Sequence, residues 1–194
     1  IFQTIDLYDE LVVSEIENKQ CIVECDAFEL PKKNTLTLSY EAFCSVSDVD
    51  VPGVKVNLKK GIPSGGGLGG GSADAAALVR VLQKMCGIKL SDEKLDLIAS
   101  KTGSDVFFFQ HCDDEGKGCA LVSGRGEVVK KIIPRDDLFL LLIFPKVSSS
   151  TKEAYDLVDK YLAKKDKVKG PGLAELEDIY RKAVNQWNFV NTFT

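Results

Sequence analysis

The chain lacks a long apolar run, an excess of basic residues and a Cys-x-x-Cys pair. Its longest apolar stretch, residues 138–144, is far shorter than the ~20 residues that span a bilayer, and no signal segment is visible. With 25 Lys and Arg against 29 Asp and Glu, the net charge of −4 provides no basic surface for counterion release. The six cysteines form no Cys-x-x-Cys motif, which favours reduced thiols over disulfides or a zinc site. We therefore expect no nucleic-acid partner and no membrane partner.

The remaining composition is that of a globular protein. The chain has 194 residues, of which 44% are hydrophobic, so it can bury a core in one large domain or two small ones. We expect strands at 11–16, 20–24, 54–58, 118–123, 127–133 and 138–144, and helices at 34–44, 72–86, 91–103, 151–162 and 173–184. The first two strands should be adjacent and joined by a turn at 17–19. These elements predict an α+β fold, and no internal repeat is visible.

The most informative segment lies between the strand at 54–58 and the helix that follows it. Six of the seven residues from 65 to 71 are glycine, and an alanine-rich helix begins directly afterwards. Glycine lets backbone N–H groups approach an anion without a Cβ in the way, and a helix N-terminus carries partial positive charge. A structural turn needs only one or two glycines. The segment therefore predicts a phosphate-binding loop, whose candidate residues are Pro63, Gly65, Gly66, Gly67, Leu68, Gly69, Gly70, Gly71, Ser72 and Ala73.

Two common phosphate loops do not fit this context. The glycines formally match Gly-x-Gly-x-x-Gly, but a dinucleotide-binding fold requires a second strand ending in an acidic residue about 20 positions later. Here residues 90–94 begin another helix instead. A Walker loop requires Gly-Lys-Ser or Gly-Lys-Thr, which the chain lacks. Ser72 is suited equally to capping the helix and to binding phosphate or magnesium through its hydroxyl group.

The segment Pro63-Ser-Gly-Gly-Gly-Leu-Gly-Gly-Gly-Ser-Ala-Asp-Ala-Ala76 resembles the second motif of the GHMP kinase family. Three other segments are similar to that family in the same order. Residues 2–11 resemble an early strand, and Gly103-Ser-Asp-Val-Phe-Phe108 resembles Gly-Ala-Asp-Val-Pro-Phe. The third segment, Val147-Ser-Ser-Ser-Thr-Lys-Glu-Ala-Tyr155, resembles a Val-Ser-Thr segment. The additional glycines are more similar to members that act on 4-diphosphocytidyl-2-C-methyl-D-erythritol than to mevalonate or homoserine kinases.

This resemblance implies a two-domain GHMP kinase fold, incomplete here. Residues 1–118 would form the N-terminal, ATP-binding domain, which is like domain 2 of ribosomal protein S5, and residues 119–194 part of a ferredoxin-like C-terminal domain. The implied reaction is ATP- and Mg²⁺-dependent phosphorylation of the 2-hydroxyl of 4-diphosphocytidyl-2-C-methyl-D-erythritol, in non-mevalonate isoprenoid precursor biosynthesis. Asp105 would accept the hydroxyl proton, and Tyr155 would stack on the cytosine ring. Without the resemblance, Asp105 is expected to cap the segment after Gly103, and Tyr155 to belong to the core.

Some parts of the family pattern are absent from the chain. It has no Ala-Lys-Ile-Asn-Leu, Gly-Tyr-His or Ser-Gly-Ser-Gly segment; Phe107 replaces a proline and Ala73 a small hydroxyl residue. Because the missing segments belong outside both ends, we expect a fragment of the kinase, truncated at both ends, which need not be active alone. Two alternatives stay open, namely another small-molecule kinase of the family, of the mevalonate or homoserine type, and a catalytically inactive nucleotide-binding module.

Three further expectations concern the surroundings and the remaining polar residues. The resemblance implies a bacterial cytoplasm or a plastid stroma, and it is compatible with a homodimer. The lone histidine, His111, is expected at the surface or in a loop. The acidic residues 113–115 are expected to form a solvated turn, because no other metal ligand is spaced to join them.

Overall fold

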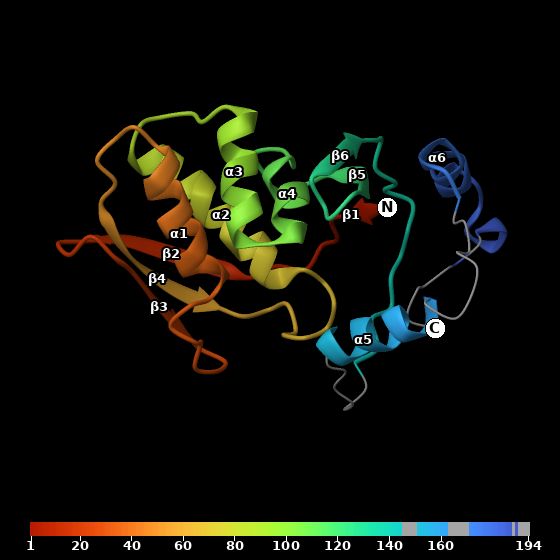
Figure 1. The fold of residues 1–194 in the computed structure, drawn as a ribbon, viewed down its shortest axis with the longest axis horizontal. Helices are drawn as coiled ribbons and strands as arrows, with labels where there is room; N and C mark the ends of the chain where they lie inside the picture. Colours follow the sequence, from red (N-terminus) through yellow and green to blue (C-terminus); the bar gives the residue numbers. More distant parts are fainter. Residues whose placement is uncertain (145–150, 163–170, 188, 190–194) are drawn as a thin grey trace. The chain divides into compact units, whose positions relative to one another are not determined.

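The computed structural model describes residues 1–144, 151–162, 171–187 and 189 (Figure 1). The chain divides into two compact units, Ile1–Arg135 and Asp136–Thr194. The first unit contains two three-stranded sheets and four helices, and the described residues of the second form two helices and a 3₁₀ turn. This mixture confirms the expected α+β class.

The first sheet consists of β2 (Glu10–Ile16), β3 (Cys21–Cys25) and β4 (Gly53–Lys59) in the order β2-β4-β3. Strand β4 pairs antiparallel with β2 and parallel with β3, so the expected adjacency of the first two strands is wrong. The reason is burial. Val54, Val56 and Leu58 of β4 are almost fully enclosed, which requires a central position, whereas the two outer strands alternate between exposed and half-buried residues.

Four helices lie on one side of this sheet in Figure 1: α1 (Thr35–Val46), α2 (Gly70–Met85), α3 (Asp92–Thr102) and α4 (Ser104–Gln110). Helix α1 begins with a capping box, in which Asn34 accepts hydrogen bonds from the N–H groups of Leu36 and Thr37. Helices α1, α2 and α3 share one hydrophobic core with the sheet, and its largest fully enclosed side chains include Phe43, Leu78, Leu82 and Ile98. Each such side chain contributes about 2 kcal/mol through burial.

The boundaries of α2 differ from the predicted range, 72–86, by two residues at the start and by one at the end. Its N-cap is Gly69, which has a φ of +69°, so the expectation that Ser72 caps the helix is wrong. The glycine loop makes the turn into the helix through its own backbone, and Ser72 therefore lies in the first turn. At the other end the helix ends at Met85 with Cys86 as its C-cap, and the expected helix stop, Gly87, follows with a φ of +63°. Helix α3 begins after Ser91 and ends before Gly103, also as expected.

The second sheet has the order β1-β5-β6 and is antiparallel throughout. Its strands are β1 (Phe2–Gln3), β5 (Cys119–Ser123) and β6 (Val128–Lys131), which confirms the two strands expected around the turn at 124–126. The ring of Phe2 contacts the ring of Phe108 edge-on, with 5.4 Å between centroids. This contact joins the start of the chain to helix α4.

The second unit contains α5 (Thr151–Leu162), α6 (Leu173–Arg181) and a 3₁₀ turn (Val184–Gln186). Helix α5 has the expected bounds, whereas α6 ends at Arg181 rather than at residue 184. The strand expected at 138–144 is wrong, because these residues form no strand and Phe139 is fully exposed. A strand needs a neighbour to accept its backbone hydrogen bonds, and no described strand pairs with this segment. Among the described residues, no helix is long and apolar enough to cross a membrane.

Candidate functional site

The glycine loop lines a cavity of about 370 Å³, together with residues from the end of β4 and the start of α1. Gly65, Gly67 and Gly69 all have φ values between +69° and +75°, which side chains with a Cβ rarely adopt. A Cβ built at Gly65 or Gly67 would meet no atom within 4 Å. Glycine at these two positions therefore serves the backbone conformation and keeps the space beside the loop open.

The N-terminus of α2 is part of the same cavity. The first bonds of this helix are donated by the N–H groups of Ser72 and Ala73, both to the carbonyl of Gly69 at 2.9 Å. The N–H groups of Gly70 and Gly71 precede them and have no carbonyl one turn back, as at any helix start. Gly70, Gly71 and Ser72 all line the cavity, so a sixteen-residue helix presents its positive end there.

Asp105 lies close to the end of the glycine loop. Its Oδ2 atom is 3.8 Å from the position that a Cβ would take at Gly69, and the side chain of Phe109 is 3.0 Å from the same position. Asp105 is exposed and stands in the first turn of α4, whose N-cap is Gly103. The fold therefore brings an accessible carboxylate beside the loop from a segment more than thirty residues further along the chain.

The other predicted site residues fall in different places. Pro63 and Leu68 line the cavity with the glycines, whereas Ala73 does not belong to its lining. Tyr155 is on helix α5 of the second unit, and its side chain lies outside the described part of the structure. Phe107, which replaces a family proline, is buried in a small cluster with Ala75, Ala99 and Val106.

The sequence analysis missed a buried charged cluster next to the loop. The Lys60 ammonium, directly after β4, forms ion pairs with Asp9 and, at 3.2 Å, with Asp74. Asp9, directly before β2, also accepts hydrogen bonds from the N–H groups of Gly61 at 2.7 Å and Ile62 at 2.8 Å. All three side chains are nearly closed to solvent, with exposed fractions of 9% for Lys60, 2% for Asp9 and 5% for Asp74. This arrangement ties the end of β4 to the first turn of α2.

The cluster perturbs the pKa values of all three groups. Burial, together with the negative charge of Asp9, raises the pKa of Asp74 to about 7, although the attraction of Lys60 lowers it. Burial alone would raise the pKa of Asp9, but hydrogen bonds from Ile62, Lys60 and Gly61 outweigh this effect, so the pKa is lowered. Burial alone would lower the pKa of Lys60, but its two carboxylate partners outweigh this effect, so the pKa is raised. Asp74 is therefore the group of the cluster that titrates near neutral pH.

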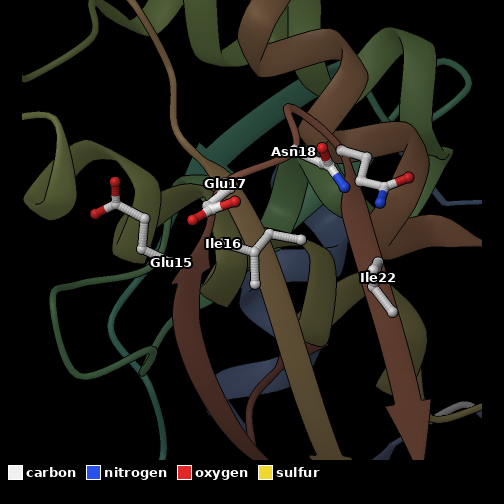
Figure 2. A pocket seen from close by; sticks show the side chains of 6 residues that line it. Glu15, Ile16, Glu17, Asn18 and Ile22 are labelled. Carbon is white, nitrogen blue, oxygen red and sulfur yellow. The ribbon is translucent and has the colours of Figure 1, made fainter.

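The first unit also has polar features outside the glycine loop. Figure 2 shows a shallow hollow beside the turn between β2 and β3, lined by Glu15, Glu17 and Asn18 among others. Its carboxylates disfavour phosphate. His111 lies in the turn directly after α4, in agreement with the expected loop position, and is half-buried, with Nε2 3.0 Å from Asp96 Oδ1. Asp113 accepts hydrogen bonds from the N–H groups of Glu115 and Lys117, which confirms the expected turn.

The described residues contain neither a group of possible metal ligands nor a disulfide bond. Within the described ranges, no three His, Cys, Asp or Glu side chains are grouped so that they could hold a metal ion. All six cysteines are free thiols, as expected from their spacing.

Comparison with known proteins links these features to one family. Residues 33–113, which include both the glycine loop and Asp105, match the family model for the GHMP kinases N terminal domain. A Treponema pallidum protein named 4-diphosphocytidyl-2-C-methyl-D-erythritol kinase is 35% identical over 99% of this chain and 66% of its own length. A Thermotoga maritima protein of the same name is 41% identical over 93% of this chain and 61% of its own length. The chain thus spans slightly less than two thirds of these relatives.

Two solved structures resemble the fold. A crystal structure of 4-(cytidine 5'-diphospho)-2C-methyl-D-erythritol kinase has a TM-score of 0.53 and 28% identity, covering 77% of this chain and 51% of that one. A homoserine kinase from Cytophaga hutchinsonii has a TM-score of 0.57 and 22% identity, covering 76% and 50%. The second likeness concerns the fold alone.

Proposed function

Because the chain belongs to the GHMP kinase family and has part of its fold, we propose that the glycine loop binds the phosphates of ATP. We further propose that the whole protein phosphorylates the 2-hydroxyl group of 4-diphosphocytidyl-2-C-methyl-D-erythritol, as the names of its relatives indicate. The observation that carries this proposal is the placement of Asp105 beside a loop of open backbone amides.

The cavity has the chemistry that a nucleotide requires. Its volume of about 370 Å³ lies within the usual range for small-molecule sites. The glycines and the start of α2 offer backbone donors for phosphate, whereas Phe28, Leu30 and Leu36 offer apolar surface for a base. A polar loop and an apolar wall in one cavity support binding of a nucleotide rather than of free phosphate.

Asp105 is the candidate general base. In phosphoryl transfer the protein mainly positions the reacting groups and stabilises charge, and a carboxylate accepts the proton of the attacking hydroxyl group. Asp105 is accessible and adjoins the loop that would hold the γ-phosphate. Lys60, the cation next to the loop, is paired with Asp9 and Asp74 instead, so it leaves the Asp105 carboxylate available for this role.

Magnesium fits this site as a partner of the phosphates. Mg²⁺ commonly binds through one or two carboxylates, water and substrate phosphates rather than through a cage of protein ligands. The residues here fit that pattern, because the Asp105 carboxylate adjoins Gly69 and Ser72 lines the cavity. When bound, the ion would neutralise charge on the phosphates.

Two finer assignments remain proposals. We propose that the N-terminal family domain occupies residues 1–118, with residues 119–194 belonging to the C-terminal domain. We also propose that Tyr155 stacks on the cytosine ring of the substrate. Replacing Tyr155 by Ala should then raise KM for the cytidyl substrate and leave KM for ATP unchanged.

The test uses the full-length protein with ATP, Mg²⁺ and the cytidyl substrate, and measures ADP release. Asp105→Asn should reduce kcat by about 100-fold or more, the usual contribution of a general base. Asp92→Asn is the matched control, because Asp92 is also exposed and also lies in the first turn of a helix. Turnover of homoserine or mevalonate in place of the cytidyl substrate would contradict the substrate assignment. ATP binding without transfer to any substrate would indicate an inactive binding module.

A further inference from the structure

We propose that Phe109 is a positioning residue for the reaction, because its ring sets the distance between Asp105 and the glycine loop. Arg80 contributes to the same distance by holding the end of α4, the helix that carries both Asp105 and Phe109. The inference rests on the proposed function in one respect only, namely that Asp105 acts as the general base.

The ring of Phe109 packs against Gly69, the N-cap of α2. Its Cε2 and Cζ atoms are 3.0 and 3.3 Å from the position that a Cβ would take at Gly69, and Asp105 Oδ2 is 3.8 Å from the same position. Asp105 and Phe109 are four residues apart on α4, so their side chains lie on one face of this helix. The ring and the carboxylate therefore meet the loop together, and the ring limits how closely the carboxylate approaches it.

A hydrogen bond holds the end of α4 to α2. The Arg80 guanidinium, on α2, donates to the carbonyl of Phe109. In a longer helix this carbonyl would accept from the N–H group of Asp113, but that group donates to the carbonyl of Lys117 instead. Arg80 thus satisfies a carbonyl in the last turn of α4, and its positive charge lies at the negative end of that helix.

Other aromatic side chains support the ring of Phe109. It contacts the ring of Phe108 edge-on, with 5.1 Å between centroids, and Phe108 contacts Phe2 of β1 in the same way at 5.4 Å. Phe108 is almost fully buried, and a closely packed interior leaves such a ring little room to move. The contacts form a continuous row from the second sheet to Gly69. The half-buried ring of Phe109 is therefore a rigid spacer.

Helix α2 consequently carries both fixed points of the proposed reaction geometry. Its N-terminus lines the cavity proposed for the phosphates, and Arg80, further along the same helix, holds α4. A general base has to lie within hydrogen-bond reach of the proton it accepts, and a misplacement of about 1 Å can lower the rate by about 100-fold. A shorter side chain in place of Phe109 would let α4 shift toward the loop and would move Asp105 with it.

The experiment measures steady-state kinetics of the full-length protein with ATP, Mg²⁺ and the cytidyl substrate. Phe109→Leu keeps an apolar side chain but removes the ring, so it should lower kcat about tenfold and change KM for ATP less than about twofold. Phe107→Leu is the matched control on the same helix, because Phe107 packs in the separate cluster with Ala75 and Ala99. Its kcat should stay within about twofold of the wild type. A raised KM for ATP with unchanged kcat in Phe109→Leu would overturn the inference.

A double-mutant cycle shows whether Phe109 acts through Asp105. In the Asp105→Asn background, Phe109→Leu should change the remaining kcat by less than about twofold, because no base is left to misplace. A tenfold loss in both backgrounds would overturn the inference and leave the proposed function intact, since the ring would then act independently of the carboxylate. Unchanged kcat in Asp105→Asn alone would overturn both.

Variants of Arg80 cover the case in which Phe109→Leu does not fold. Arg80→Met removes the hydrogen-bond donor but keeps an extended side chain, and it should lower kcat about fivefold without changing KM for ATP. Arg80→Lys retains a donor for the carbonyl of Phe109, so it should recover at least about half of the wild-type kcat. Equal kcat values in these two variants would overturn the inference, because the bond to this carbonyl would then have no part in placing Asp105.

Discussion

Gly67 and Gly87 have almost the same backbone conformation but different surroundings. Their φ values are +70° and +63°, and a Cβ at either would meet nothing within 4 Å. Alanine at either position should therefore cost about 1 kcal/mol of stability, through backbone strain alone. Only Gly67 lines the cavity.

We therefore expect Gly67→Ala to weaken ATP binding about tenfold and Gly87→Ala to leave it unchanged. The measurements are calorimetric titration with ATP and urea unfolding of both variants. Similar affinities in two equally destabilised variants would mean that the glycine loop does not hold the nucleotide.

Asp74 should also shape the pH dependence of stability. Its pKa in the folded protein, about 7, is above the ordinary value of 3.8, so its contribution to folding is fully present below that value and is lost as pH rises through 7. Asp74→Asn removes this loss. Relative to the wild type, the free energy of unfolding of the variant should increase by about 2 kcal/mol between about pH 5 and pH 8.

Urea unfolding at a series of pH values checks this expectation. Asp9 should behave in the opposite sense, because its pKa is lowered and its contribution is lost as pH falls through the acidic range. Parallel stability curves for wild type and Asp74→Asn would show that Asp74 has an ordinary pKa in the folded protein.

At the scale of single elements, two helix starts differ in their caps. Asn34 accepts two backbone hydrogen bonds at the start of α1, whereas Ser91, the N-cap of α3, accepts none from its helix. We expect Asn34→Ala to destabilise the protein by about 1 kcal/mol, and Ser91→Ala by only a few tenths. Chemical denaturation of both variants measures the difference. Equal losses would show that the capping box at Asn34 contributes nothing particular.

Local patterns were sufficient to predict most elements but not their pairing. The helices at Asn34, Ser91 and Thr151 follow from spacing and caps within a few residues. The position of β4 between its two neighbours depends on contacts with strands up to 49 residues earlier, which no local pattern records. The segment at 138–144 has the composition of a buried strand, yet strand formation depends on a partner, and its own residues do not specify one.

The same limit applies to the candidate site. The glycine loop is continuous in sequence, so it was predictable, and Asp105 was identified by resemblance to family motifs. The cluster beneath the loop combines Asp9, Lys60 and Asp74 from three separate segments, and charged residues are ordinarily at the surface. Two signals were nevertheless present, namely a lysine immediately before the loop and a single carboxylate within an alanine-rich helix start.

At the scale of the whole molecule, the two units differ in how many hydrophobic side chains they bury among the described residues. The first unit contains an extended core, whereas Tyr180 is the one buried hydrophobic residue among the described residues of the second. The only tryptophan, Trp187, stacks on Tyr180 with 5.8 Å between ring centroids. Its fluorescence therefore reports on the second unit alone.

We expect the fluorescence of Trp187 to change at a lower urea concentration than the far-ultraviolet circular dichroism, which the helices of the first unit dominate. A shortened protein ending after Arg135 should retain the later transition, since the first unit has its own core. Coincident transitions from the two probes would show that the chain unfolds as one cooperative body.

The topology also sets an order of events during synthesis on the ribosome. The first sheet cannot close until β4 has emerged, because β4 separates the two strands made before it. The glycine loop follows β4 within ten residues, so the nascent chain completes this sheet and exposes its anion-binding backbone at nearly the same moment. Strand β1 has to wait much longer, because its partner, β5, begins only at Cys119. The residues of β1, although they precede the first sheet in the chain, are thus among the last of this unit to pair.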